Sequence, residues 1–147
     1  MVKKKQDLHY YESIGRRKES VARVRLHLVT GKKSSVQSLN KGDFLINDKP
    51  LSQYFSLKRD INRILKPLIL TNNNDRFIIT IQTKGGGVNG QVDAISLGLS
   101  RALCMVDESY KSVLRSEELL TRDARVRERR MVGTGGKSRR QKQSPKR

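Results

Sequence analysis

The chain has 147 residues, which suits one domain. Its formal net charge of +18 favours a polyanionic partner such as nucleic acid over a merely soluble basic protein. A single cysteine excludes an intrachain disulfide, and with two histidines it argues against a structural zinc site. No apolar run approaches the roughly 18 residues of a membrane span, and the N-terminus lacks the apolar region of a secretory signal.

The first predicted element after a basic N-terminal extension (residues 1–9) is a β-hairpin. Alternating residues 20–29 predict a half-buried strand whose apolar side carries Ala22, Val24 and Leu26 and whose other side is cationic. The preceding "HYYES" is its expected partner. The turn is expected in "IGRRK", where Gly15 supplies the turn conformation and three cations crowd the tip.

Residues 31–43 are typical of a loop, and "FLIN" of a short strand. The spacing in residues 51–70 predicts one helix, which Pro67 should end or kink. Residues 76–84 alternate again and predict a strand with Phe77, Ile79 and Ile81 on one face.

A glycine-rich stretch, "GGGVNG", precedes a long predicted helix whose apolar stripe runs from Val92 to Val106. A second helix is expected near "DESYKSVLRSEELL", capped by its acidic start. The pattern dissolves from residue 121 onward. Residues 129–147 hold eight cations and no acid, so they cannot bury a core. We therefore expect a globular α+β body at residues 10–121 and an extended basic tail at residues 122–147.

Two glycine-rich stretches could bind phosphate. "KGGGVNGQ" follows a predicted strand and opens a helix, where unpaired N–H groups favour an anion; the alternative is a turn that needs positive φ angles. Gly85, Gly87 and Gly90 fit a dinucleotide fingerprint only because the glycines are crowded, and no compact βαβ unit with a matching acid follows. "MVGTGGKSRR" fails the phosphate-loop pattern because Met131 stands where its first glycine is required.

No nucleophile, base and orienting group can be assembled, so the sequence predicts no enzyme and no cofactor. His27 is expected to be a surface residue on the polar face of its strand.

Cations fall into three groups: the hairpin, the segment after residue 121, and the tail. Arginine prevails in the first two, which suits bidentate contact with phosphate. Aromatic residues make up only 5% of the chain, which argues against a base-stacking sheet and favours recognition of backbone and shape. If the tail neutralises about eight phosphates, its affinity should fall with salt with a log–log slope of about −5 to −7.

Five motifs in order resemble the bacterial and organellar type of small-subunit ribosomal protein nine: "YESIGRRKESVARVRL", "INDKPLSQYF", "GGGVNGQVDAISLGLSRAL", "LLTRDARVRERR" and the closing "PKR". The resemblance implies a small mixed sheet packed with helices, similar to domain two of ribosomal protein five, plus the tail. It also implies a structural role in the head of the small subunit, bound to ribosomal RNA, to neighbouring ribosomal proteins and to peptidyl-site tRNA.

The resemblance and the cation groups together give a set of candidate residues. The ones expected at ribosomal RNA are Arg16, Arg17, Lys18, Arg23, Arg25, Lys84, Gly85, Gly86, Gly87, Gly90, Arg122, Arg125, Arg127, Arg129, Arg130, Lys137, Arg139 and Arg140. By position, Lys146 and Arg147 are similar to the tail tip that approaches the tRNA anticodon stem-loop in the family.

The chain departs from the family pattern in two places. The tail lacks the family's aromatic residue and has Pro145 before the final Lys-Arg, and the loop at residues 31–43 is longer than the family hairpin. The asparagine- and lysine-rich segments suggest a plastid rather than a bacterial cytoplasm. Two alternatives remain: a general nucleic-acid-binding protein outside the ribosome, and a small phosphotransferase that uses "GGGVNG".

Overall fold

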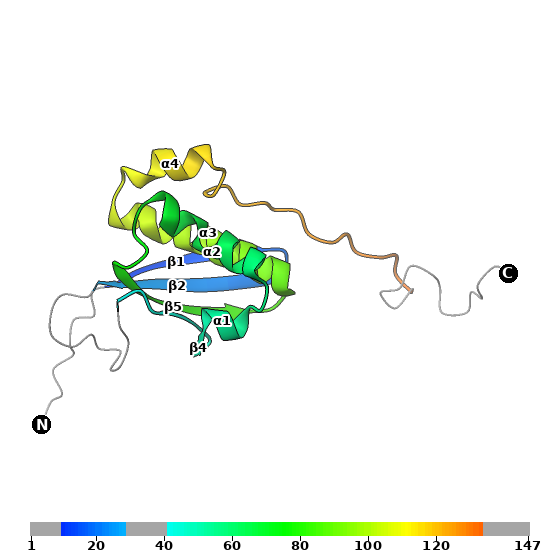
Figure 1. Cartoon of the computed structure of the whole chain (residues 1–147). Coiled ribbons are helices and arrows are strands. Elements are labelled where there is room, and N and C mark those ends of the chain that lie inside the picture. The colour runs from blue at the N-terminus through cyan, green and yellow to red at the C-terminus, as the bar shows by residue number, and fades with distance from the viewer. Residues whose placement is uncertain (1–9, 29–40, 134–147) are drawn as a thin grey trace, which may run out of the picture.

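The computed structural model describes residues 10–28 and 41–133 (Figure 1). Residues 1–9, 29–40 and 134–147 lie outside this part, and with them the predicted N-terminal extension, most of the predicted loop at residues 31–43 and the end of the predicted tail. The described residues form a five-stranded sheet and four helices, so the predicted α+β class is confirmed. None of these helices has both the length and the apolar character needed to cross a bilayer.

The hairpin joins β1 (Tyr10–Arg17) to β2 (Ser20–Leu28) in antiparallel register. Its turn is shorter and later than predicted: Lys18 takes the positive φ, at 51°, while Gly15 pairs with Ala22 inside the strand. Gly15 is needed for a different reason. A Cβ there would lie 1.8 Å from the Ala94 carbonyl oxygen of the helix packed on β1. The prediction that Gly15 makes the turn was therefore wrong.

The sheet is mixed, in the order β1-β2-β5-β3-β4. The predicted strand near residues 76–84 is confirmed as β5 (Phe77–Lys84), which pairs antiparallel with β2 and parallel with β3 (Phe44–Ile46). The short β4 (Lys49–Pro50) completes the edge. Asn47 and Asp48 make the turn between β3 and β4 with positive φ angles, which asparagine and aspartate tolerate better than most residues.

The predicted helix at residues 51–70 is two helices, α1 (Leu51–Tyr54) and α2 (Lys58–Leu70). The chain becomes extended at Phe55, whose side chain is 3% exposed and belongs to the core, so core packing outweighs the helical spacing. Pro67 does not end α2. It lies in the last turn, where its missing N–H costs one backbone hydrogen bond, and the Thr71 hydroxyl donates to its carbonyl oxygen at 3.0 Å.

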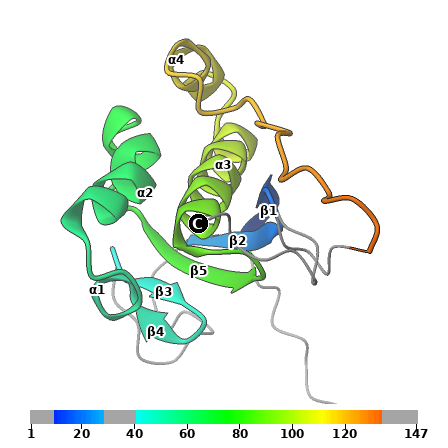
Figure 2. The ribbon, with the colours of Figure 1, turned by 90° about the vertical axis from the view of Figure 1, so that its right-hand side faces the viewer.

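The two longest helices cover one face of the sheet. α3 (Val88–Val106) lies over β1 and β2, and α2 lies beside it (Figure 2). The short α4 (Tyr110–Ser116) packs across α3 and α2. The predicted second helix is thus confirmed. Its N-cap is Ser109, which makes no side-chain capping hydrogen bond, so the expected acidic cap is not formed. The Asp107 side chain instead accepts the Ser109 N–H at 2.9 Å, just before the helix.

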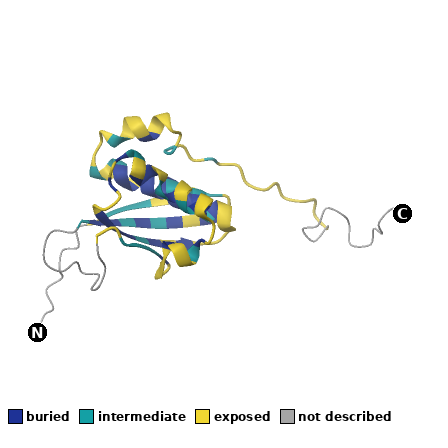
Figure 3. Ribbon diagram, viewed as in Figure 1, coloured by how far each residue is buried: buried dark blue, intermediate teal, exposed yellow. Residues whose placement is uncertain are grey.

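The core lies between the sheet and these helices (Figure 3). The predicted apolar faces of β2 and β5 meet the predicted apolar stripe of α3, and all of the residues below are 2% exposed or less. Burying each large aliphatic side chain of this kind contributes about 1.5–3 kcal/mol. These residues are Ala22, Val24, Leu26, Phe77, Ile79, Ile81, Val92, Ile95, Leu99, Ala102 and Leu103.

After α4 the chain leaves the body, and its described part up to residue 133 has no further helix or strand. Residues 121–133 contain no helix or strand and run away from the sheet (Figure 1). Val126, Met131 and Val132 are 64%, 74% and 86% exposed, so no apolar packing holds this stretch. The exact residue that divides the body from the tail, placed at 121 by the sequence, stays a prediction.

Candidate nucleic-acid interface

Four of the candidate cations lie on the sheet face opposite α2 and α3, which we call the outer face. The alternation that buries Ala22, Val24 and Leu26 turns the intervening side chains of β2 outward, and the strand register carries the pattern to β1 and β5. The outer face of these three strands has Glu12 as its single acid. Its cations are Arg16, Arg23, Arg25 and Lys84.

Neighbouring polar groups orient two of these guanidinium groups. Arg25 forms an ion pair with Glu12, with Nε 2.5 Å from Oε2, and its guanidinium lies 5.1 Å from the centre of the Tyr10 ring. Arg23 donates to the side-chain oxygen of Gln82 on β5. Each guanidinium has five N–H donors, so these contacts fix its direction and leave donors for a partner. The side chains of Arg16 and Lys18 are exposed and make no hydrogen bond or ion pair with the described residues.

His27 is buried rather than a surface residue, so this prediction was wrong. Its ring is 8% exposed, lies 2.9 Å from the Thr80 hydroxyl and packs against Tyr10 at a centroid distance of 5.6 Å. Burial lowers the pKa of His27 below its ordinary value of 6.5, and the nearby Arg25 charge lowers it further. The strand alternation placed His27 on the correct face, but it could not show that the Tyr10 ring and the Thr80 side chain lie against it.

The glycine loop packs against the hairpin. Gly85 and Gly86 have φ angles of 73° and 63°, so the expectation of a turn with positive φ is confirmed for both. A Cβ at Gly86 would lie 2.0 Å from the Ser20 hydroxyl oxygen, and one at Gly90 would lie 2.8 Å from it. Ser20 also donates to the Gly85 carbonyl oxygen at 3.1 Å. Three of the four glycines therefore have a structural reason to be glycine.

Gly87 is different, because no atom lies within 4 Å of a Cβ built there. It is the N-cap of α3, whose first turn contains no acid, and residues 84–89 are exposed. The first N–H groups of a 19-residue helix thus lie at the surface beside Lys84, an arrangement that favours an anion. In the described chain α3 is followed by α4 and not by a strand, so the βαβ context of a dinucleotide site is lacking.

The segment at residues 121–133 presents the second group of cations. Arg122, Arg127, Arg129 and Arg130 are exposed along it. Arg125 is also exposed but is bonded to Asp123, with Nη2 2.7 Å from Oδ2. The remaining candidates, Lys137, Arg139, Arg140, Lys146 and Arg147, lie outside the described residues.

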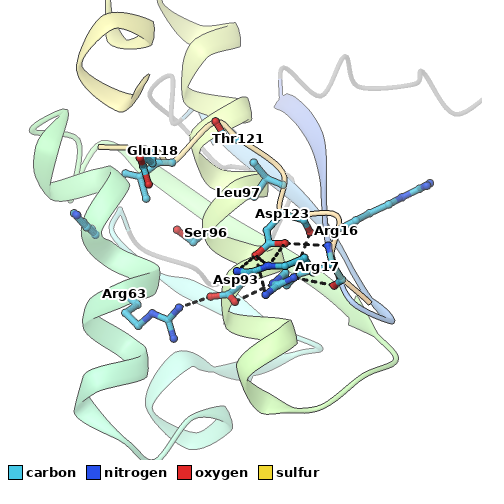
Figure 4. Close-up of a pocket in the computed structure, with 12 residues that line it drawn as sticks. Arg16, Arg17, Arg63, Asp93, Ser96, Leu97, Glu118, Thr121 and Asp123 are labelled. Atoms are coloured by element: carbon cyan, nitrogen blue, oxygen red, sulfur yellow. Dashed lines mark hydrogen bonds and ion pairs between the residues drawn. The ribbon is translucent and has the colours of Figure 1, made fainter. Parts of the chain in front are cut away.

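A hollow of about 510 Å³ lies where β1, α2, α3 and the start of this segment meet (Figure 4). Arg17 stands in it between two acids, Asp93 of α3 and Asp123 of the segment, and Arg63 of α2 reaches Asp93. The sequence did not single out Asp93, Asp123 or Arg63. A lone acid within "TRDAR", among so many cations, was the available signal, but its partner is 106 residues away in the sequence.

Comparison with known proteins identifies the family. The model of the family described as ribosomal protein S9/S16 matches residues 15–147. The chain belongs to this family. It is 39% identical over 122 residues to small ribosomal subunit protein uS9 of Chlorobium limicola, covering 83% of this chain and 86% of that protein.

Two further relatives have the same description. The uS9 protein of Ureaplasma parvum is 39% identical over 132 residues, which are 90% of this chain and 91% of that protein. The uS9 protein of Chlorobaculum tepidum is 41% identical over 122 residues, which are 83% and 86% of the two chains. The chain is therefore a ribosomal protein of the small subunit with a structural role, and not an enzyme. This excludes the phosphotransferase hypothesis.

Proposed function

We propose that the protein binds small-subunit ribosomal RNA in the subunit head through the outer face, the glycine loop and the arginine-rich segment. The observation that carries the proposal is the distribution of charge. Four cations and one acid occupy the outer face, while residues 122–130 carry five arginines and two acids. Helices α2, α3 and α4 on the opposite side also carry cations, but Asp60, Asp93 and the acids on either side of α4 lie among them. The outer face and the arginine-rich segment are both mainly cationic, which suits a nucleic-acid backbone.

The physical mechanism is neutralisation of phosphates with release of counterions. Arg23 and Arg25 suit this because Gln82 and Glu12 already orient them, so less side-chain freedom is lost on binding. The open Gly87 position lets an RNA backbone approach the N-terminus of α3 closely. With few aromatic side chains, recognition relies on backbone contact and shape.

We also propose that the body, residues 10–121, and the tail, residues 122–147, have different tasks. The body docks on ribosomal RNA and on neighbouring head proteins, and the tail passes through RNA so that Lys146 and Arg147 reach peptidyl-site tRNA. This rests on the family membership and on the match of the final residues to the family pattern. Deletion of Lys146 and Arg147 should leave assembly intact and weaken tRNA binding at the peptidyl site. Unchanged tRNA affinity would contradict the assignment.

The plastid location remains a separate hypothesis. It rests on the asparagine- and lysine-rich segments, whereas the relatives compared above are bacterial. Subcellular fractionation of the source cells tests it. Recovery of the protein with plastid ribosomes would support the hypothesis, and recovery with cytoplasmic ribosomes of a bacterium would end it.

A matched pair of triple variants tests the RNA-binding surface. In the first, Arg16→Gln, Arg23→Gln and Lys84→Gln remove three charges from the outer face. In the control, Lys58→Gln, Lys111→Gln and Arg115→Gln remove three from the exposed helical side. Affinity for a head-domain ribosomal RNA fragment is measured across salt concentrations. The first variant should lower the magnitude of the log–log slope by about 2 to 3, and the control should leave it nearly unchanged. Equal losses in both would contradict the proposed surface.

A further inference from the structure

Arg17 differs from the other cations of the hairpin. Its neighbour Arg16 is exposed, whereas the Arg17 side chain is only 14% exposed and uses all three guanidinium nitrogens within the chain. Nε lies 3.5 Å from Asp93 Oδ2, and Nη2 lies 3.0 Å from Asp123 Oδ2. Nη1 donates to the main-chain carbonyl oxygens of Arg125, at 3.0 Å, and of Asp123, at 3.4 Å.

These contacts join the body to a segment whose aliphatic side chains face solvent. The last apolar side chains that pack on the core before this segment are Leu119 and Leu120. Asp93 lies in α3 and is also bound by Arg63 of α2, so it is fixed to the body from two helices (Figure 4). Asp123 lies in the segment after α4, where the chain has no regular structure. Arg17, from the end of β1, therefore bridges the body to the first residues of the segment.

The segment is shaped to receive this bridge. The Asp123 carboxylate accepts the Arg125 backbone N–H at 2.9 Å and two donors of the Arg125 side chain, which folds residues 123–125 into a local turn. These bonds with Arg125 hold the pKa of the Asp123 carboxyl well below its usual range. The turn presents two carbonyl oxygens and a charged carboxylate to the Arg17 guanidinium.

An RNA phosphate is a poor partner for this side chain. To bind Arg17 it would have to displace two carboxylates and two carbonyl oxygens, and it would leave Asp93 and Asp123 close together without their shared cation. The chemistry instead suits an internal, multiply hydrogen-bonded cation.

We propose that Arg17 is a positioning residue that fastens the root of the C-terminal segment to α3 and so sets the direction in which the segment leaves the body. This replaces the expectation from the sequence that Arg17 contacts RNA. A fixed exit direction would reduce the conformational entropy that the segment loses when it binds RNA. This benefit rests on the proposed binding of RNA by the segment.

The test compares Arg17→Gln with Arg16→Gln, two adjacent arginines of which one bridges and one does not. Spin labels are placed on cysteines introduced at Asn62 of α2 and at Val126 of the segment, in a Cys104→Ser background. Distances are measured by pulsed electron paramagnetic resonance on the full chain without RNA. The parent and the Arg16 variant should give a narrow distance distribution, and the Arg17 variant should lose it. A distribution that stays narrow in the Arg17 variant overturns the proposal.

A second variant guards against simple unfolding. Asp123→Asn leaves the body intact, since the side chain lies outside the core, and it should also broaden the distribution while the melting curve of the body stays unchanged. An unchanged distribution in Asp123→Asn overturns the proposal even if Arg17→Gln does not fold.

RNA binding separates this inference from the proposed function. Arg17→Gln should weaken binding to the head-domain RNA fragment without changing the salt slope, because it loses no phosphate contact. Arg16→Gln should lower the magnitude of the slope by about 0.7 to 0.9. If both variants bind RNA as the parent does while the distance distribution broadens in Arg17→Gln, the bridge stands and the proposed RNA surface fails. A slope reduced equally by both variants overturns the positioning role.

Discussion

The body and the C-terminal segment of this protein are held by opposite means. In the body, β1 approaches α3 so closely that a side chain has no room at Gly15 of the strand or at Gly98 of the helix. In the segment at residues 121–133, aliphatic side chains face solvent and the contact with the body runs through the Arg17 guanidinium. Steric packing defines one region and charge the other. Stability should therefore depend on the first, and binding to a polyanion on the second.

The largest expected effect is on stability, from Gly15→Ala. The added Cβ would lie 1.8 Å from the Ala94 carbonyl oxygen and 2.6 Å from the Gly98 nitrogen, so strand and helix must separate. Overpacking against backbone of this kind should cost about 3 kcal/mol or more. Denaturant unfolding of the full chain measures the loss.

The matched control is Gly87→Ala, at the open N-cap of α3, where no atom would meet the new Cβ. It should change the free energy of unfolding by about 1 kcal/mol or less, because alanine is a poorer N-cap than glycine but lowers the entropy of the unfolded chain, and the two effects partly cancel. If both substitutions cost the same, close packing does not define the body.

The next effect concerns binding. A chain that ends at Gly133 loses six cations, namely Lys137, Arg139, Arg140, Lys142, Lys146 and Arg147. The magnitude of the salt slope for the RNA fragment should fall by about 4 to 5, while the free energy of unfolding stays unchanged. Titrations at several salt concentrations, with unfolding curves of both chains, check the two halves of this prediction. A shortened chain with lower stability would show that the removed residues take part in the body.

The smallest expected effect is a pH dependence of stability that comes from His27, the titratable group buried at the outer face. The pKa of His27 is lowered in the folded chain, so the unfolded chain takes up the proton first as the pH falls. The free energy of unfolding should be constant above about 6.5 and decrease as the pH falls below it. The ring is surrounded by Tyr10, Thr80 and Arg25, and Glu12 lies beyond Arg25.

His27→Gln keeps a polar partner for Thr80 and removes this titration, so its stability should be flat between pH 8 and about 5. Thermal unfolding of both chains in one buffer series makes the comparison. The same slope in the variant would show that another group causes the dependence.

Local patterns predicted much of this molecule. The strand at Phe77–Lys84, the helix at Val88–Val106 and the faces of β2 follow from periodicity, because each depends on residues close together in the sequence. The motifs also indicated the family, which the comparisons confirm. Gly15 was misplaced because a glycine between polar residues is typical of a turn, whereas its actual constraint comes from a helix about 80 residues later.

In the candidate site, too, local sequence predicted which residues are present, whereas their partners depend on distant parts of the chain. The sequence located the cations, but it could not show which of them already have partners. Arg16 and Arg17 are adjacent and chemically identical, yet only Arg17 meets Asp93 and Asp123, and that difference arises from packing of distant elements. The break in the predicted helix at Phe55 has the same origin. The extended backbone there places the Phe55 side chain in the core, which the helical spacing of the sequence did not predict.

The most direct test of the account is sedimentation of a tagged copy of the protein in lysate of its source cells, with and without ribonuclease. We predict migration with small ribosomal subunits at one copy per subunit, and loss of that migration after nuclease treatment. Migration as a free protein, or with heterogeneous nucleic acid, would contradict the assignment of the chain to the RNA framework of the small subunit.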